Sequence, residues 1–203
     1  MYIPSFNRVD DPAILLAAMR TYSFAILFGP DANGDPVATH LPLVIQQEGP
    51  HGTIEGHFAR ANPHWQSLAG QKTLVVFPGP HSYVSPSLYA SKQSVPTWNY
   101  IAIHATGTLQ LVEDEAGKES LLRNLIAATE PAFLDQWHTQ TGQYRSSMLK
   151  NITGFRIPID KLEGKFKLSQ NRPDPDRASI LAAQAAGSPD EQALAAWMQR
   201  FEA

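Results

Sequence analysis

The sequence has no cysteine among its 203 residues. A chain without thiols cannot form disulfide bonds, thiolate metal sites or a cysteine nucleophile. Long apolar runs are also missing, and the first residues, MYIPSFNRVDDP, lack the charged-then-apolar pattern of a secretory signal. We therefore expect a cytoplasmic protein that does not span a membrane.

Motifs for nucleotide-binding loops and for a serine nucleophile are lacking too. The chain contains no G-x-G-x-x-G, no G-x-x-x-x-G-K-[ST] and no G-x-S-x-G. Its acidic residues lie mostly in turns and at expected helix starts, where caps need them, and not in pairs suited to acid–base chemistry. Rossmann-type or P-loop nucleotide binding and a nucleophile elbow are therefore not supported.

The charge of the chain and the spacing of its histidines narrow the range of possible functions further. Charged residues make up 17% of the chain and the net charge is −3, so only a local basic patch is left to attract nucleic acid. No two histidines have the i, i+4 spacing of a helical zinc site, and we predict no zinc. His40 and His57 lie in expected strands, where each either lines a pocket or has a structural role; the others are His51, His64, His81, His104 and His138.

Most of the chain is predicted to form short strands joined by tight turns. A helix is expected from Pro12, and Asn33-Gly34 is a strong hairpin signal. The expected strands cover residues 24–28, 37–45, 53–59, 73–77, 98–111 and 152–157, with helices at 63–68, from 114 and over 144–150. The strand at 24–28 is expected to be buried, and the apolar strand at 73–77 is expected to be central because it lacks polar alternation.

The stretch from Trp98 to Leu111 has the clearest pattern, because apolar and polar residues alternate along it. A period of two predicts a strand with one buried face, and Gly107 within it predicts a bulge or the close approach of another backbone or ligand. About six antiparallel strands without βαβ alternation favour a mainly β fold with peripheral helices (α+β), arranged as a closed or split barrel.

Residues 80–97 are the best candidate for part of a binding site. The segment is rich in hydroxyl groups, and its prolines hold it open as a non-helical connection. Arg60 offers a planar fork for a phosphate, which Ser85, Ser87, Lys92 and Thr97 would complete, and Tyr83, Tyr89, Trp98 and Tyr100 would border a flat ring. Alternatively, Arg60 is a solvated charge and the aromatic residues belong to the core. The density of these hydroxyl, cationic and aromatic residues in so short a stretch favours a binding site for a phosphorylated, planar cofactor.

The chain from residue 161 onward differs from the rest. Residues 161–177 gather five cations around Ser169, Gln170 and Asn171. The sequence Ser188-Pro189-Asp190-Glu191 then predicts a helix start, followed by an apolar face of Leu194, Trp197, Met198 and Phe201. That face needs a cover, either the barrel or a second subunit.

Six segments resemble the PaiB-type, FMN-binding negative transcriptional regulator family. They are MYIP with DDP, ATHLPL (38–43), GPHGTIEGHFARANPHW (49–65), FPGPHSYVSPSLY (77–89), VPTWNYIAIHATG (95–107) and LEGKFKLSQNRP (162–173). The resemblance implies a split β-barrel related to pyridoxamine 5′-phosphate oxidase and flavin-reductase barrels, and a homodimer with FMN near the subunit interface. Residues 1–177 would be the FMN-binding domain, and 178–203, which match no motif, a helical extension packed on the barrel or the dimer partner.

The resemblance also implies which residues bind the flavin. Carried onto this chain, they are His40, Arg60, Ala61, Asn62, Ser85, Ser87, Tyr89, Lys92, Thr97, Trp98, Asn99, Lys167, Ser169, Gln170 and Asn171.

The sequence is compatible with three functions. The first is an FMN-binding homodimer that represses transcription, although no helix-turn-helix pattern is present to read DNA. The second is a flavin-dependent oxidoreductase or flavin reductase acting on a small molecule. The third is a barrel that has lost its flavin or holds haem through His40 or His104, which the hydroxyl-rich loop makes less favourable.

Overall fold

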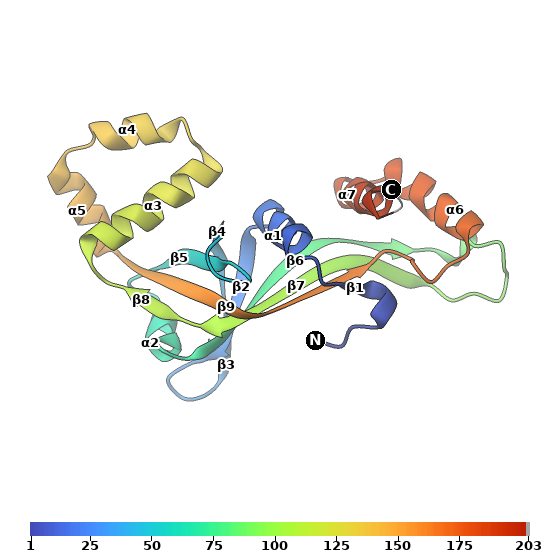
Figure 1. Ribbon diagram of the computed structural model, residues 1–203, viewed down its shortest axis with the longest axis horizontal. Helices are drawn as coiled ribbons and strands as arrows, with labels where there is room; N and C mark the ends of the chain where they lie inside the picture. Colours follow the sequence, from blue (N-terminus) through green and yellow to red (C-terminus); the bar gives the residue numbers. More distant parts are fainter. Residues whose placement is uncertain (202–203) are drawn as a thin grey trace. The chain divides into compact units, whose positions relative to one another are not determined.

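The computed structural model describes residues 1–201, and the chain divides into two compact units. The central unit comprises Pro12–Phe77 and His104–Leu162, and the terminal unit comprises Met1–Asp11, Pro78–Ile103 and, of the described residues, 163–201. Three strands, β6 (Lys72–Val84), β7 (Thr97–Thr108) and β9 (Ile152–Lys167), each continue from one unit into the other (Figure 1).

The described residues form one nine-stranded, mainly antiparallel sheet. Its order is β3-β2-β6-β7-β9-β5-β4, and β1 and β8 also pair with β9. The shorter strands are β1 (Arg8–Val9), β2 (Phe24–Pro30), β3 (Pro36–Pro42), β4 (Val44–Gln46), β5 (Thr53–Ala59) and β8 (Gln110–Val112).

In the central unit the sheet curves until β3 contacts β5, which closes a barrel. Helices surround it: α1 (Pro12–Thr21) contacts β4, α2 (His64–Leu68) contacts β2, and α3 (Glu115–Thr129) contacts β4 and β5. Two further helices, α4 (Phe133–Thr139) and α5 (Gly142–Lys150), pack on α3. The predicted split barrel with peripheral helices is therefore confirmed, and α4 was not predicted.

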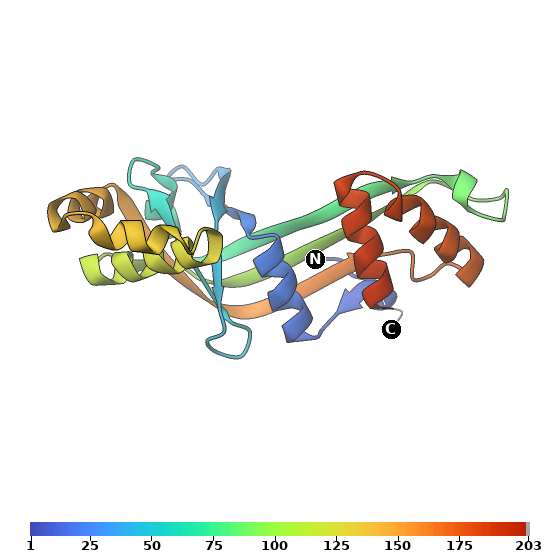
Figure 2. The ribbon, with the colours of Figure 1, turned by 90° about the horizontal axis from the view of Figure 1, so that it is seen from above.

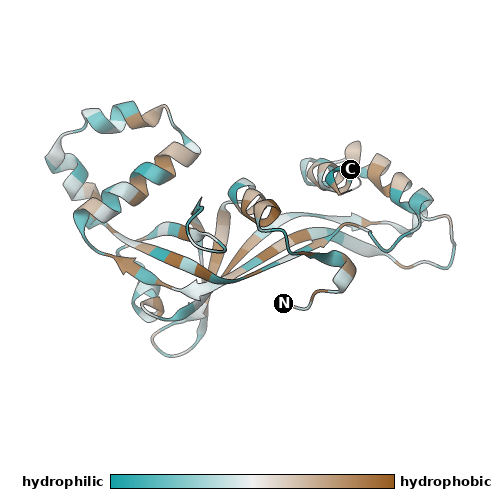
Figure 3. Ribbon diagram, in the orientation of Figure 1, coloured by the Kyte–Doolittle hydropathy of each residue, from teal (hydrophilic) through white to brown (hydrophobic). Residues whose placement is uncertain are grey.

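Alternation along the strands builds the core of the central unit. Hydrophobic and polar residues follow one another along β7 and β9 in Figure 3. Phe58 and Phe155 are fully buried with ring centroids 5.0 Å apart, and Leu27 and Ile54 are fully buried as well. A Cβ at Gly107 would lie 2.1 Å from the carbonyl oxygen of Pro158, which confirms that another backbone approaches this glycine.

Several strand predictions were wrong in burial or length. Phe24 and Phe28 on β2 are 61% and 38% exposed, so only one face of this strand is buried. Residues 37–45 belong to two strands, since β3 pairs with β2 whereas β4 pairs with β5. The strands at 73–77 and 152–157 continue much further, as β6 and β9. Pro78 and Pro80 do not stop β6, since they lie beyond the Leu74–Val76 segment that pairs with β2.

The terminal unit adds two 3₁₀ turns, η1 (Ser5–Asn7) and η2 (Pro86–Leu88), and the helices α6 (Asp174–Ala185) and α7 (Pro189–Arg200). The two helices lie side by side (Figure 2). α7 begins with the predicted cap, in which Ser188 and Glu191 each accept a hydrogen bond from the other's backbone N–H. Phe166 packs edge-on against Trp197 at 5.1 Å, so β9 supplies a cover for the apolar face of α7. The division into 1–177 and 178–203 stays a prediction, and its last two residues lie outside the described chain.

None of the helices within residues 1–201 is both long and apolar enough to cross a bilayer. In the same part of the chain, His, Asp and Glu side chains do not gather in groups of three or more that would hold a metal ion.

A buried carboxylate ties the barrel to α3. Glu55 is 2% exposed and accepts hydrogen bonds from Arg156 Nε (2.8 Å), Gln46 Nε2 (3.0 Å) and Asn124 Nδ2 (2.8 Å). Its charge is therefore paired and both of its oxygens are satisfied, as burial of an ion requires.

Replacing Glu55 by alanine should lower the free energy of unfolding by about 3 kcal/mol, because it leaves three donors without their acceptor. The control is Asp160→Ala, which breaks an exposed 3.3 Å pair with Lys72 and should cost less than about 1 kcal/mol. Urea unfolding followed by circular dichroism measures both; equal losses would show that the Glu55 network does not stabilise the barrel.

Candidate functional site

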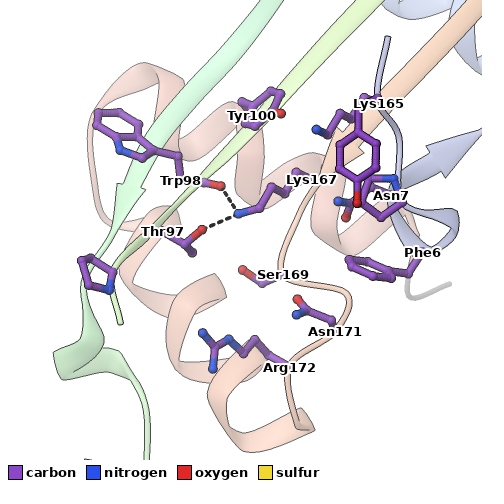
Figure 4. A pocket seen from close by; sticks show the side chains of 13 residues that line it. Phe6, Asn7, Thr97, Trp98, Tyr100, Lys165, Lys167, Ser169, Asn171 and Arg172 are labelled. Atoms are coloured by element: carbon purple, nitrogen blue, oxygen red, sulfur yellow. Dashed lines mark hydrogen bonds between the residues drawn. The ribbon is translucent and has the colours of Figure 1, made fainter. Parts of the chain in front are cut away.

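A cavity of about 520 Å³ lies in the terminal unit, lined by the N-terminal segment, the start of β7 and the end of β9 (Figure 4). Three of its lining residues are cations, Lys165, Lys167 and Arg172. The aromatic lining residues are Tyr2, Phe6, Trp98 and Tyr100, and the polar ones are Asn7, Thr97, Ser169 and Asn171. The cavity thus combines positive charge, hydroxyl and amide groups, and flat rings.

Lys167 is the best anchored of the three cations. Its Nζ donates to Thr97 Oγ1 and to the carbonyl of Trp98, both at 2.5 Å, as the dashed lines in Figure 4 show. Burial, together with the positive charges of Lys165 and Arg172, lowers the pKa of Lys167 below its usual range. The protonated amine is therefore held at an energetic cost that a bound anion would offset.

The other two cations lie on aromatic rings. The guanidinium of Arg172 is 4.0 Å from the ring centroid of Tyr89, which is itself buried. The ammonium of Lys165 is 5.3 Å from the ring centroid of Tyr100 and 5.6 Å from that of Tyr2. Such cation–π contacts orient a long side chain without neutralising its charge. All three cations therefore keep their charge available to a ligand.

A tight turn after β9 holds these cations in place. Gln170 accepts the Leu168 N–H through Oε1 at 2.7 Å and donates through Nε2 to the carbonyl of Phe166. Ser169 donates through Oγ to Oδ1 of Asn99 at 2.9 Å, and both residues are buried. Asn99 and Gln170 therefore support the turn, and neither lines the cavity.

The residues expected to bind the flavin from residues 85–99 and 167–171 thus separate into three groups within the terminal unit. Thr97, Trp98, Lys167, Ser169 and Asn171 line the cavity together. Asn99, Gln170 and Tyr89 lie behind them, against the turn or Arg172. Ser85 and Ser87 bond to each other at 2.9 Å at the start of η2, and Lys92 is exposed; these three do not line the cavity.

The remaining expected residues, His40 and Arg60 to Asn62, belong to the central unit. Arg60 is exposed, with its guanidinium 5.8 Å from the Trp65 ring centroid and its Nη2 3.5 Å from the carbonyl of Ile152. His40 is exposed beside Phe24, and Ala61 is exposed in the turn after β5. Asn62 accepts the His64 N–H at 3.0 Å and so supports the start of α2.

The central unit has a cavity of its own, of about 580 Å³, near α2. Asn62 and His64 line it together with Asp31. His64 bonds through Nδ1 to Thr39 Oγ1 at 2.8 Å, and burial lowers the pKa of this imidazole. The charged residue of its described lining is a carboxylate, so this cavity is less suited to a phosphate than the one in the terminal unit.

The N-terminal part of the site, Tyr2, Phe6 and Asn7, was not predicted from the sequence. Tyr100 was predicted to border a ring, whereas Lys165 and Arg172 were predicted only as part of a basic cluster and not as flavin-site residues. The missing signal was strand length: in an extended strand, Lys165 and Lys167 share a face because side chains alternate with a period of two. With the strand ended at Ile157, that relation was not visible.

The fold defines the chain as a split-barrel protein, and comparison with known proteins specifies it further. Residues 1–161 match the family described as "Putative FMN-binding domain". The chain is 36% identical over 185 residues to "Protease synthase and sporulation protein PAI 2" of Bacillus subtilis strain 168, covering 89% of this chain and 87% of that protein. The chain belongs to the PaiB-type FMN-binding family, and FMN is its cofactor.

Solved structures agree on the fold. The flavocytochrome Anf3 of Azotobacter vinelandii aligns with a TM-score of 0.66 and 17% identity, covering 87% of this chain and 78% of that one. The FAD and haem binding protein of Mycobacterium smegmatis aligns with a TM-score of 0.64 and 17% identity, covering 90% and 81%. At this level of identity the likeness shows the split barrel alone.

The terminal cavity has the chemistry that FMN requires. Lys165, Lys167 and Arg172 match the charge of its phosphate, and Trp98 and Tyr100 offer rings to its flat isoalloxazine. The volume of about 520 Å³ lies in the usual range of small-molecule sites, roughly 300–1,000 Å³. When bound, FMN supplies an acceptor and donor of electrons, which no side chain of this cavity provides.

The lowered pKa of Lys167 predicts how FMN affinity depends on pH. The phosphate is fully ionised above about pH 7, and it favours the protonated amine, so binding should raise the pKa of Lys167. Affinity should then be highest near pH 7 and fall as pH rises through the lowered pKa of the free protein. Lys167→Arg keeps its charge at every pH used and should give a nearly flat profile. Fluorescence titrations between pH 7 and 9.5 measure this; parallel profiles for both proteins would exclude Lys167 as the phosphate ligand.

Proposed function

We propose that this chain is a homodimeric, FMN-binding negative transcriptional regulator of the PaiB type, with the FMN phosphate bound among Lys165, Lys167 and Arg172. The observation that carries the binding part is the convergence of these three cations in one cavity with an aromatic wall. The regulatory part is supported by the 36% identity to a sporulation protein over nearly the whole of both chains.

An exposed apolar face of the central unit supports the homodimer. The register of β2 and β3 pairs Phe24 with Pro42, Ile26 with His40 and Phe28 with Ala38, so these side chains share one face of the sheet. Phe24 is 61% exposed and Phe28 is 38% exposed. Neighbouring apolar side chains with this much exposure are typical of surfaces that associate.

A charge on this face should dissociate the dimer. We expect the wild-type protein to have twice the chain mass in size-exclusion chromatography with light scattering, and Phe24→Asp to shift it toward the monomer. The matched control, Gln47→Asp, adds the same charge at an exposed position after β4 and should stay dimeric. A wild-type monomer, or a dimer that tolerates Phe24→Asp, would contradict this interface.

Regulation and catalysis predict different outcomes with FMN-saturated protein. A regulator should select particular genomic fragments over shuffled DNA of the same length, with affinity that falls steeply as salt rises. Fluorescence anisotropy measures this, and equal affinity for selected and shuffled DNA would exclude the regulatory proposal.

A flavin reductase should instead lose its visible flavin absorbance when NADH or NADPH is added without oxygen. Bleaching by a nicotinamide, combined with no DNA preference, would favour the oxidoreductase.

A further inference from the structure

Ser169 has an unusual backbone conformation in the turn that carries the cations. Its φ is +62°, and it is the one non-glycine residue with positive φ among residues 1–201. This left-handed region disfavours residues with a Cβ, and such strain persists only where surrounding contacts hold it, often at functional sites. Some contact must therefore offset the strain at Ser169.

The hydrogen bond to Asn99 is one such contact, beside the two hydrogen bonds that Gln170 makes within the turn. The carboxamide oxygen of Asn99 accepts only, so the Ser169 hydroxyl is the donor and its proton is directed away from any ligand. Asn99 is completely buried and Ser169 is 4% exposed. A 2.9 Å bond between two buried groups is costly to break, because each would be left without a partner.

The conformation of Ser169 sets the relation between the two cations on either side. Lys167 precedes the turn, and Arg172 closes it by donating its backbone N–H to the carbonyl of Ser169 at 3.0 Å. Figure 4 shows Ser169 and Asn171 between Lys167 and Arg172. If Ser169 left the left-handed region, the chain would leave the turn in another direction, and Arg172 would lose its place over Tyr89.

We propose that Asn99 and Ser169 are positioning residues that bind no flavin atom themselves: their hydrogen bond holds the turn in its left-handed conformation so that Lys167 and Arg172 face one phosphate. This inference rests on the proposed FMN site, and it changes the role expected for both residues from cofactor contact to support.

A glycine at position 169 distinguishes support of the turn from contact with the cofactor, because glycine adopts positive φ without strain and has no hydroxyl. Four variants are compared with the wild type: Ser169→Ala, Ser169→Gly, Asn99→Val, and the double variant Asn99→Val with Ser169→Gly. Ser169→Ala and Asn99→Val keep the strain and remove the bond, so FMN affinity should fall roughly tenfold. Ser169→Gly should stay within about threefold of the wild type. Adding Ser169→Gly to Asn99→Val should restore most of the lost affinity.

The measurement is the dissociation constant of FMN by flavin fluorescence, with the melting temperature of each ligand-free variant as a folding control. Equal losses for Ser169→Ala and Ser169→Gly would mean that the hydroxyl contacts the ligand and would overturn the proposal. A double variant whose FMN affinity is no higher than that of Asn99→Val would overturn the positioning role of Asn99.

Failure of the FMN site itself has a different signature, which is a wild-type protein that binds no FMN. The stabilisation of each variant by inorganic phosphate, measured as a rise in melting temperature, then tests positioning separately. The same order, with glycine close to the wild type and alanine below it, supports the proposal, and any other order overturns it.

Discussion

The hydrogen-bonded pairing of β9 is the constraint on which both units depend. This 16-residue strand pairs with β5 and β8 in the central unit and with β1 in the terminal unit, so its backbone groups are satisfied at both ends. The side chains of β9 alternate between its two faces, and this alternation decides which of them enter a core and which line the cavity. Phe155 and Ile157 enter the barrel core, Phe166 packs under α7, and Lys165 and Lys167, on the opposite face to Phe166, line the cavity. The positions of Lys165 and Lys167 are therefore fixed by the same period of two that fills the cores.

The fold could be predicted from the sequence where local rules decide it. Alternation along 98–111, the close approach at Gly107 and the cap at Ser188 each rest on neighbours in the sequence, and the structure confirms all three. Strand ends were harder, because prolines normally end strands. Pro78 and Pro80 are tolerated since β2 has already ended its pairing with β6, which is a tertiary fact that local sequence does not contain.

The site could be predicted only in part for the same reason. Composition singled out the hydroxyl-rich loop and the basic cluster, and five of the expected residues do line one cavity. The distinction between contact and support was not accessible. Asn99 and Trp98 are adjacent in the sequence, yet one is completely buried and the other half-exposed, because neighbours in a strand face opposite ways. Tyr2 and Phe6 lie almost a hundred residues or more from the other walls, so pairing of β1 with β9 was needed to bring them there.

Positive charge that is not paired with a carboxylate of residues 1–201 gives the terminal cavity its character. In the barrel, by contrast, Arg156 is paired with the carboxylate of Glu55. Lys165, Lys167 and Arg172 instead meet rings, a hydroxyl and a carbonyl, which orient them but leave their charge uncompensated. Such a site gives up stability in the free protein and recovers it with an anion, which is how a binding site differs from a structural ion pair.

The half-exposed indole of Trp98 has an optical consequence. Trp137 and Trp197 are buried and do not line the cavity, whereas Trp98 borders it and its carbonyl accepts a hydrogen bond from Lys167. Its emission overlaps the absorption of oxidised flavin, so energy transfer from this indole would make the fluorescence of the protein report cofactor occupancy. Because the chain has no cysteine, an external dye could be attached at a single introduced thiol without competing reactions.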